Sequence, residues 1–164
     1  MIKILVSACI LGHPVRYNGS ANTIEHKLLA RWHEEGRIVP LCPEIAAGFP
    51  TPRAPAEIEP GMSGDDVLAG ISLVFEDNGT DVTKQFVLGA RLALETAQEN
   101  NCKFALLTDG SPSCGTTYQY SGSFDGKTRE AMGVVASLLA SNGIAVFAEH
   151  QIEELNQAVC GHRS

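Results

Sequence analysis

Short, nearly continuous runs of hydrophobic residues recur along the chain, and segments with helical periodicity separate them. Runs of this kind are typical of strands that are covered on both faces of a sheet. They predict strands at Ile2–Ser7, Ile38–Leu41, Phe104–Leu107 and Ile144–Phe147. A fifth candidate strand, Ile71–Phe75, has a less regular pattern.

Between these runs, apolar side chains recur every three or four residues, which predicts amphipathic helices. The expected helices run from a cap at Asn22 to Gly36, from a cap at Asp81 to at least Ala97, from about Arg129 to Asn142, and near Gln151–Val159. Strands that alternate with helices predict an α/β fold with a mostly parallel sheet flanked by helices. We therefore expect one Rossmann-like domain over residues 1–164, which is long enough to bury a core.

The segment 49–64 interrupts this alternation, because it contains Pro50, Pro52, Pro55 and Pro60. Proline fixes the backbone and cannot donate to a strand ladder, so we expect a stiff loop here.

Composition and charge narrow the class of protein. The chain is 44% hydrophobic, no run is long enough for a membrane span, and the N-terminus lacks the basic region of a signal peptide. We therefore expect a cytoplasmic protein whose thiols stay reduced. The net charge of −7 argues against broad nucleic-acid binding and leaves a small-molecule substrate open.

An odd count of 5 cysteines fits a metal or catalytic set better than a disulfide framework.

Three cysteines occupy equivalent places in the predicted fold. Cys9 and Cys42 follow the first two strands, and Cys114 lies in the loop after Phe104–Leu107. Ligands of parallel sheets bind at the carboxyl ends of the strands, so these thiols are expected to converge there although 33 and 72 residues separate them. The alternative is that each is a small core residue. We interpret Cys102 and Cys160 as structural or incidental.

Three thiolates leave one coordination position open on a metal centre. Widely separated sulfur ligands favour a 4Fe-4S cluster in which one iron has no protein ligand. A catalytic zinc with a bound water stays open as an alternative, although the Cys-x-x-Cys pairs of zinc ribbons are absent from the sequence.

Several motifs, in this order, resemble the DUF523 family, which includes the thiouracil desulfurases. They are Ser7–Gly12, Val15–Gly19, Cys42–Glu44, Pro50–Ile58 and Ser111–Gly115. The resemblance implies a 4Fe-4S cluster on Cys9, Cys42 and Cys114, with Glu44 and Ser111 as catalytic residues. It also implies removal of sulfur from thiolated uracil, as the free base or, in some relatives, within modified RNA. Relatives often carry Lys where this chain has Thr108.

The expected reaction is hydrolytic, with Glu44 as general acid–base and Ser111 as a hydrogen-bonding or proton-relaying group. Glu44 has a competing structural role, in which it braces the loop or pairs with Arg16 or Arg53, and Ser111 can be a turn former. Arg16, Arg53 and Glu57 are interpreted as loop-fixing residues, with contact between the base and Arg16 or Arg53 as the alternative. The rival functions are a cluster that only carries electrons and a non-catalytic module that binds a metal or small molecule.

Overall fold

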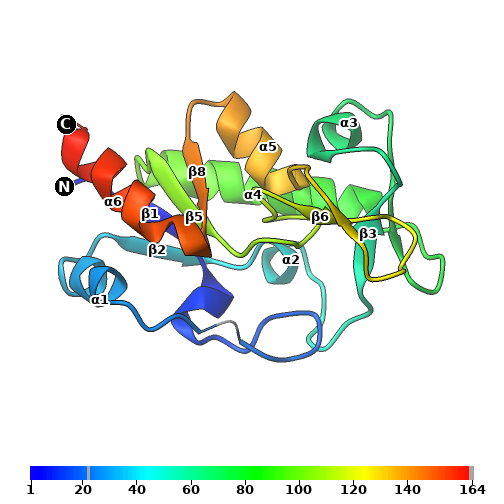
Figure 1. The fold of residues 1–164 in the computed structure, drawn as a ribbon, viewed down its shortest axis with the longest axis horizontal. Coiled ribbons are helices and arrows are strands. Elements are labelled where there is room, and N and C mark those ends of the chain that lie inside the picture. The colour runs from blue at the N-terminus through cyan, green and yellow to red at the C-terminus, as the bar shows by residue number, and fades with distance from the viewer. Residues whose placement is uncertain (22, 163–164) are drawn as a thin grey trace.

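The main sheet of the computed structural model, which describes residues 1–21 and 23–162, consists of four parallel strands. Their order across the sheet is β2-β1-β5-β8, with bounds Ile38–Leu41, Ile4–Ser7, Phe104–Leu107 and Ala145–Ala148. In register, Ile4 lies between Ile38 and Phe104. The predicted α/β fold with a parallel sheet flanked by helices is therefore confirmed (Figure 1).

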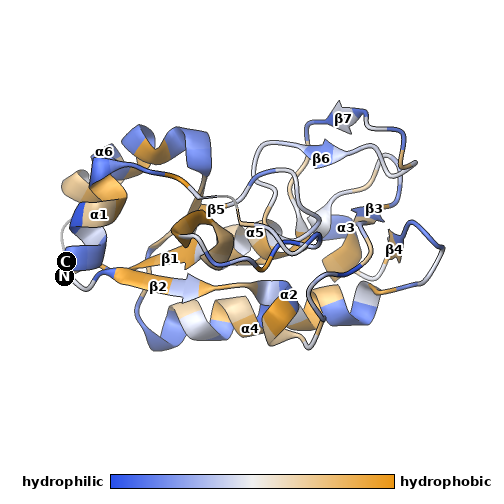
Figure 2. Cartoon of the chain, turned by 90° about the horizontal axis from the view of Figure 1, so that it is seen from below, coloured by the Kyte–Doolittle hydropathy of each residue, from blue (hydrophilic) through white to orange (hydrophobic). Residues whose placement is uncertain are grey.

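Successive residues of the strands bury against different helices, because side chains alternate between the faces of a sheet. Leu5 and Ala105 belong to a hydrophobic cluster with α4 (Thr83–Glu99) and α5 (Val134–Ser141). Ile4 and Phe104 belong to a second cluster with α1 (Lys27–Glu34) and α6 (Ile152–Gly161). Figure 2 shows α4 on one side of the sheet and α1 and α6 on the other. Continuous apolar runs are the consequence of burial on both faces.

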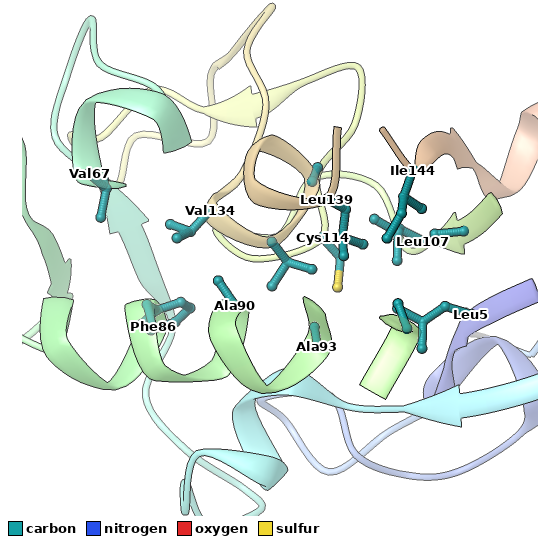
Figure 3. Close-up of a cluster of buried hydrophobic side chains, with 14 of the residues drawn as sticks. Leu5, Val67, Phe86, Ala90, Ala93, Leu107, Cys114, Val134, Leu139 and Ile144 are labelled. Atoms are coloured by element: carbon teal, nitrogen blue, oxygen red, sulfur yellow. The ribbon is translucent and has the colours of Figure 1, made fainter. Parts of the chain in front are cut away.

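The predicted apolar stripes of the two long helices are buried as expected. For α4 these residues are the N-cap residue Val82 and Phe86, Ala90, Ala93 and Ala97, and on α6 they are Ile152, Leu155 and Val159. Figure 3 shows the α4 stripe facing Leu5, Leu107 and α5. Cys114 lies in the same cluster, so this thiol is also part of the core.

Two helices begin later than the sequence pattern predicts. α1 begins at Lys27, and the Nδ1 atom of His26 accepts a hydrogen bond from the Leu28 amide at 3.1 Å. The predicted cap, Asn22, lies outside the described residues. α5 begins at Val134 instead of near Arg129, because a small hairpin of β6 (Gln119–Tyr120) and β7 (Thr128–Arg129) takes up the preceding segment.

The fifth predicted strand does not join the main sheet, and the proline-rich segment is not entirely a loop. β4 (Val74–Glu76) pairs antiparallel with β3 (Ala56–Ile58), which lies inside the segment predicted as a loop. β3 is only three residues long and lies between Pro55 and Pro60. The flanking prolines indicated a loop, so this short strand was not predicted. The remaining elements are short: η1 (Ala8–Leu11), α2 (Pro43–Ala46), α3 (Gly64–Leu68) and η2 (Glu149–Gln151).

Among the described residues, no helix is both long and apolar enough to span a membrane.

Candidate functional site

A cavity of about 480 Å³ lies at the carboxyl edge of the main sheet. Cys9 reaches it from η1 directly after β1, and Cys42 reaches it from the residue between β2 and α2. Cys114 reaches the same cavity from the loop between β5 and α5. The structure thus brings the three cysteines together at the predicted edge. Cys102 lies at the other end of β5, and Cys160 is exposed on α6.

Hydroxyl groups from neighbouring strands contact two of the three thiols. The Cys9 Sγ atom lies 2.8 Å from the Thr108 Oγ1 atom at the end of β5. The Thr108 amide donates to the Ser7 Oγ atom at 3.1 Å, and the Ser7 side chain in turn hydrogen-bonds the Cys114 thiol. Adjacent ends of β1 and β5 therefore supply the polar environment of Cys9 and Cys114.

Cys42 has a different environment, because a carboxylate stands beside it. Its Sγ atom lies 3.5 Å from the Glu44 Oε2 atom and 3.9 Å from the Val15 carbonyl oxygen. Burial, and then the charge of Glu44, raises the pKa of Cys42 to about 11. Burial likewise raises the pKa of Cys9 and, most strongly, that of Cys114.

These raised pKa values argue against nucleophilic chemistry by the three thiols as free side chains. A thiol acts as a nucleophile only as thiolate, and nucleophilic cysteines have lowered pKa values. A bound cation reverses this, because a coordinated thiol loses its proton. Buried sulfur donors on one cavity are also the ligands that iron–sulfur clusters use. The donor set therefore fits a cluster better than a catalytic cysteine.

Among the described residues, no group of three or more His, Cys, Asp or Glu side chains is arranged around the position of a single metal ion. The three thiols instead line the wall of a shared space. A cluster with several irons has ligands that are farther apart than those of one ion, and three cysteines around a cavity of about 480 Å³ are compatible with such a group.

Glu44 lies in the first turn of α2 and is only 9% exposed. Besides Cys42, its Oε2 atom faces the Arg53 guanidinium, with Nη2 at 3.9 Å. Pro43 is the first residue of the helix, where an N–H would have no intrahelical partner and the fixed φ of proline suits the helix. The carboxylate thus contacts both the candidate ligand and the predicted structural partner, so geometry alone supports either role for Glu44.

Ser111 lines the cavity, and its hydroxyl oxygen accepts the Cys114 amide hydrogen at 2.6 Å. Its carbonyl oxygen accepts from the Gln119 side chain at 2.6 Å. Ser111 therefore shapes the turn that presents Cys114, as the turn-former interpretation predicts. Its catalytic role stays a prediction.

The loop-fixing roles predicted for Arg53 and Glu57 are confirmed. Arg53 donates to the carbonyl oxygens of Val15 at 3.0 Å and Pro50 at 3.3 Å. Glu57 accepts the amide hydrogens of Gly122 and Phe124. Both charged groups join segments that are distant in the sequence, and both line the cavity.

Asp109 is a cavity-lining residue that the sequence pattern did not reveal. Its Oδ1 atom accepts amide hydrogens from Gly110, Thr116 and Thr117, and the Thr117 hydroxyl donates to Oδ2. Burial acts to raise its pKa, but these hydrogen bonds outweigh burial and lower it. The carboxylate fixes both ends of the loop that carries Ser111 and Cys114. The available signal was an Asp-Gly pair directly after a buried strand.

The chain matches the family model described as 2-thiouracil desulfurase over residues 4–151. It is 40% identical over 152 residues to the uncharacterized protein YbbK of Bacillus subtilis (strain 168), covering 93% of this chain and 99% of that protein. A solved structure of TudS, named a 4Fe-4S-dependent thiouracil desulfidase, is 42% identical. It covers 98% of this chain and 99% of its own, with a TM-score of 0.88.

Proposed function

The chain belongs to the 2-thiouracil desulfurase family, and from this premise we propose that it converts thiolated uracil and water into uracil and sulfide. The cofactor is a 4Fe-4S cluster held by Cys9, Cys42 and Cys114. The observation that carries the proposal is the convergence of these three buried thiols on one cavity with a carboxylate beside them.

When bound, the cluster supplies an iron without a protein ligand, a thiophilic Lewis acid that can polarise a C=S bond. The protein's own groups supply the rest of the chemistry. Glu44 takes the proton of the attacking water and returns it to the departing sulfur, as a general acid–base group. Arg53 holds this carboxylate in place at 3.9 Å. Ser111 hydrogen-bonds the substrate or passes on a proton.

Oxygen replaces sulfur without any change in oxidation state, so the overall reaction needs neither an electron donor nor an acceptor. The net charge of −7 favours the free thiopyrimidine over RNA as substrate. The free thiols fit a reducing compartment, and we place the protein in the cytoplasm.

Anaerobically reconstituted holoprotein tests the proposal when it is given thiouracil without reductant or nicotinamide. We expect uracil and sulfide to form in equal amounts over many turnovers. A requirement for one electron donor per turnover would instead favour the redox alternative. No turnover by protein with a full cluster would reject the enzymatic function.

A further inference from the structure

The loop between β6 and β7 reaches the mouth of the cavity with an aromatic residue. Phe124 lies in this loop, lines the cavity and is 38% exposed. Figure 1 shows the loop beside β3, on the opposite side of the molecule from α1 and α6. An aromatic side chain that is partly open on a cavity wall is free to contact a bound ligand, because ligand sites are lined mainly by apolar and aromatic groups.

Phe124 also has a backbone conformation that phenylalanine rarely adopts, with φ of 55°. Among the described residues, the other non-glycine residue with positive φ is Asn101, a residue type that tolerates the left-handed region. For a bulky residue this conformation is strained, and such strain persists where the surroundings enforce it, commonly at ligand-binding sites.

The surroundings that enforce this conformation can be identified. The Glu57 Oε1 atom on β3 accepts the Gly122 amide hydrogen at 2.8 Å and the Phe124 amide hydrogen at 3.2 Å. Gly122 permits this close approach, because a Cβ atom there would lie 2.5 Å from the Ile58 carbonyl oxygen. At the base of the loop, the Ser121 amide donates to the Lys127 carbonyl oxygen at 2.8 Å. The loop is therefore docked on β3.

The same part of the cavity wall carries other aromatic rings. Tyr118 and Tyr120 line the cavity, and their ring centroids are 6.1 Å apart in an edge-to-face arrangement. Tyr17 lines it from another loop and is 42% exposed. Aromatic side chains bind flat heteroaromatic rings by stacking, which tolerates changes in ring substituents.

We propose that Phe124 is a substrate-binding residue that covers one face of the pyrimidine ring, and that Glu57 is the positioning residue that holds it there. This inference rests on the proposed function, because it assumes a planar thiopyrimidine as substrate. The carboxylate acts through the two amide groups of the loop and not on the substrate itself.

The test compares Phe124→Leu and Phe124→Gly with wild-type holoenzyme. Leucine keeps apolar volume but removes the ring, so we expect KM for thiouracil to rise about tenfold, as for one lost base–aromatic stack, with kcat nearly unchanged. Glycine removes the ring and also the backbone strain. We therefore expect F124G to melt at a higher temperature than F124L while its KM is raised as much.

Calorimetric binding of uracil gives a readout that does not depend on turnover, and F124L should bind uracil about tenfold more weakly than wild type. Inactive wild-type holoenzyme would count against the proposed function alone, whereas equal uracil affinities of wild type and F124L would overturn the inference. A fall in kcat and cluster content at unchanged KM would also overturn it, because it would show a purely structural role for Phe124.

A double-mutant comparison tests Glu57. Glu57→Ala releases the loop and should raise KM as F124L does. If Glu57 acts through Phe124, the double variant E57A/F124L should have the KM of F124L alone. An additional, multiplicative rise in KM would show that Glu57 contacts the substrate directly and would overturn its assignment as a positioning residue.

Discussion

Glu44 stands between a candidate cluster ligand and a cation, and these two contacts correspond to its two possible roles. The Cys42 thiol lies 3.5 Å away, so the carboxylate would stand beside the cluster with Cys42 as a ligand, as proposed. The Arg53 guanidinium, 3.9 Å away, would also be the partner of a purely structural carboxylate. A buried carboxylate next to a metal ligand is costly unless it is paired, so the Arg53 contact is consistent with a catalytic group as well.

Glu44→Gln separates the two roles, because glutamine keeps the shape and most hydrogen bonds but cannot transfer a proton. We expect a normal cluster content and a loss of turnover per cluster of about 10²–10⁴-fold. Iron content and initial rate should be measured on the same preparation. The exposed Glu34 of α1 provides the control, and Glu34→Gln should match wild type. Wild-type turnover per cluster in E44Q would show that Glu44 only braces the loop.

Thr108 contacts the Cys9 sulfur at 2.8 Å, and this contact should influence the bound cluster. A hydroxyl that donates to a ligand thiolate withdraws electron density from it, and hydrogen bonds to cluster sulfurs raise the reduction potential. We expect Thr108→Val to shift the cluster potential to more negative values, as measured by a redox titration followed by electron paramagnetic resonance.

Thr108→Ser provides the matched control, because serine keeps the hydroxyl and should restore the wild-type potential. The backbone contact of Thr108 with Ser7 uses its amide and is present in both variants. Equal potentials in all three proteins would mean that the hydroxyl does not donate to the ligand in the holoprotein.

At the scale of elements, the position of α2 depends on one glycine of α4. A Cβ atom at Gly89 would lie 2.8 Å from the Pro43 carbonyl oxygen, closer than real contacts of this kind. α2 carries Glu44 and begins directly after Cys42, so any shift of this helix moves both residues. The close packing of α2 on α4 thus determines one corner of the site.

Gly89→Ala should therefore disturb the site as well as the packing of α4. We expect a loss of about 1–3 kcal/mol in the free energy of unfolding, as for other overpacked positions, and a lower iron content after reconstitution. Chemical denaturation and iron analysis measure the two effects. Gly161 of α6 has no atom near its missing Cβ, so Gly161→Ala should be neutral or slightly stabilising. Normal iron content in G89A would show that α2 adapts freely.

The elements that could be predicted from the sequence are those long enough to show a pattern. The apolar runs of β1, β2 and β5 and the apolar stripe of α4 extend over four or more residues, so they can be recognised in the sequence. β6 and β7 have two residues each, which is too few for any alternation to be seen. Their presence explains the misplaced start of α5.

The same limit applies to the site. Strand ends are visible in the sequence, and they located Cys9, Cys42 and Cys114. The contact between Cys9 and Thr108 joins residues 99 positions apart, and the Glu57 contact with Gly122 joins residues 65 positions apart. Such contacts depend on strand order and loop docking, which no local pattern records. The role of Phe124 was therefore visible only in the folded chain, and Asp109 had no sequence signal beyond the Asp-Gly pair after β5.

For the whole molecule, the three cysteines lie on segments that are far apart in the sequence, and a group bound to all three would join these segments. A group bound to the native state and not to the unfolded chain stabilises the fold by linkage. We expect removal of the cluster by a chelator under oxidising conditions to lower the melting temperature, as followed by circular dichroism.

The cysteine variants distinguish this linkage from damage during oxidation. Cys9→Ala, Cys42→Ala and Cys114→Ala should lack the cluster and melt like stripped wild type, apart from the small local cost of each change. Cys102→Ala and Cys160→Ala should keep the cluster and its stabilisation. A full cluster in C114A would remove Cys114 from the ligand set.

The strand order β2-β1-β5-β8 also bears on how the enzyme matures in the cell. Cys9 and Cys42 come from neighbouring strands early in the chain, but Cys114 follows β5, which pairs with β1 only after the long α4 has been synthesised. A nascent chain on the ribosome therefore offers two thiols without the third. The complete set of three thiols therefore exists only after the loop that follows β5 has been made and β5 has paired with β1.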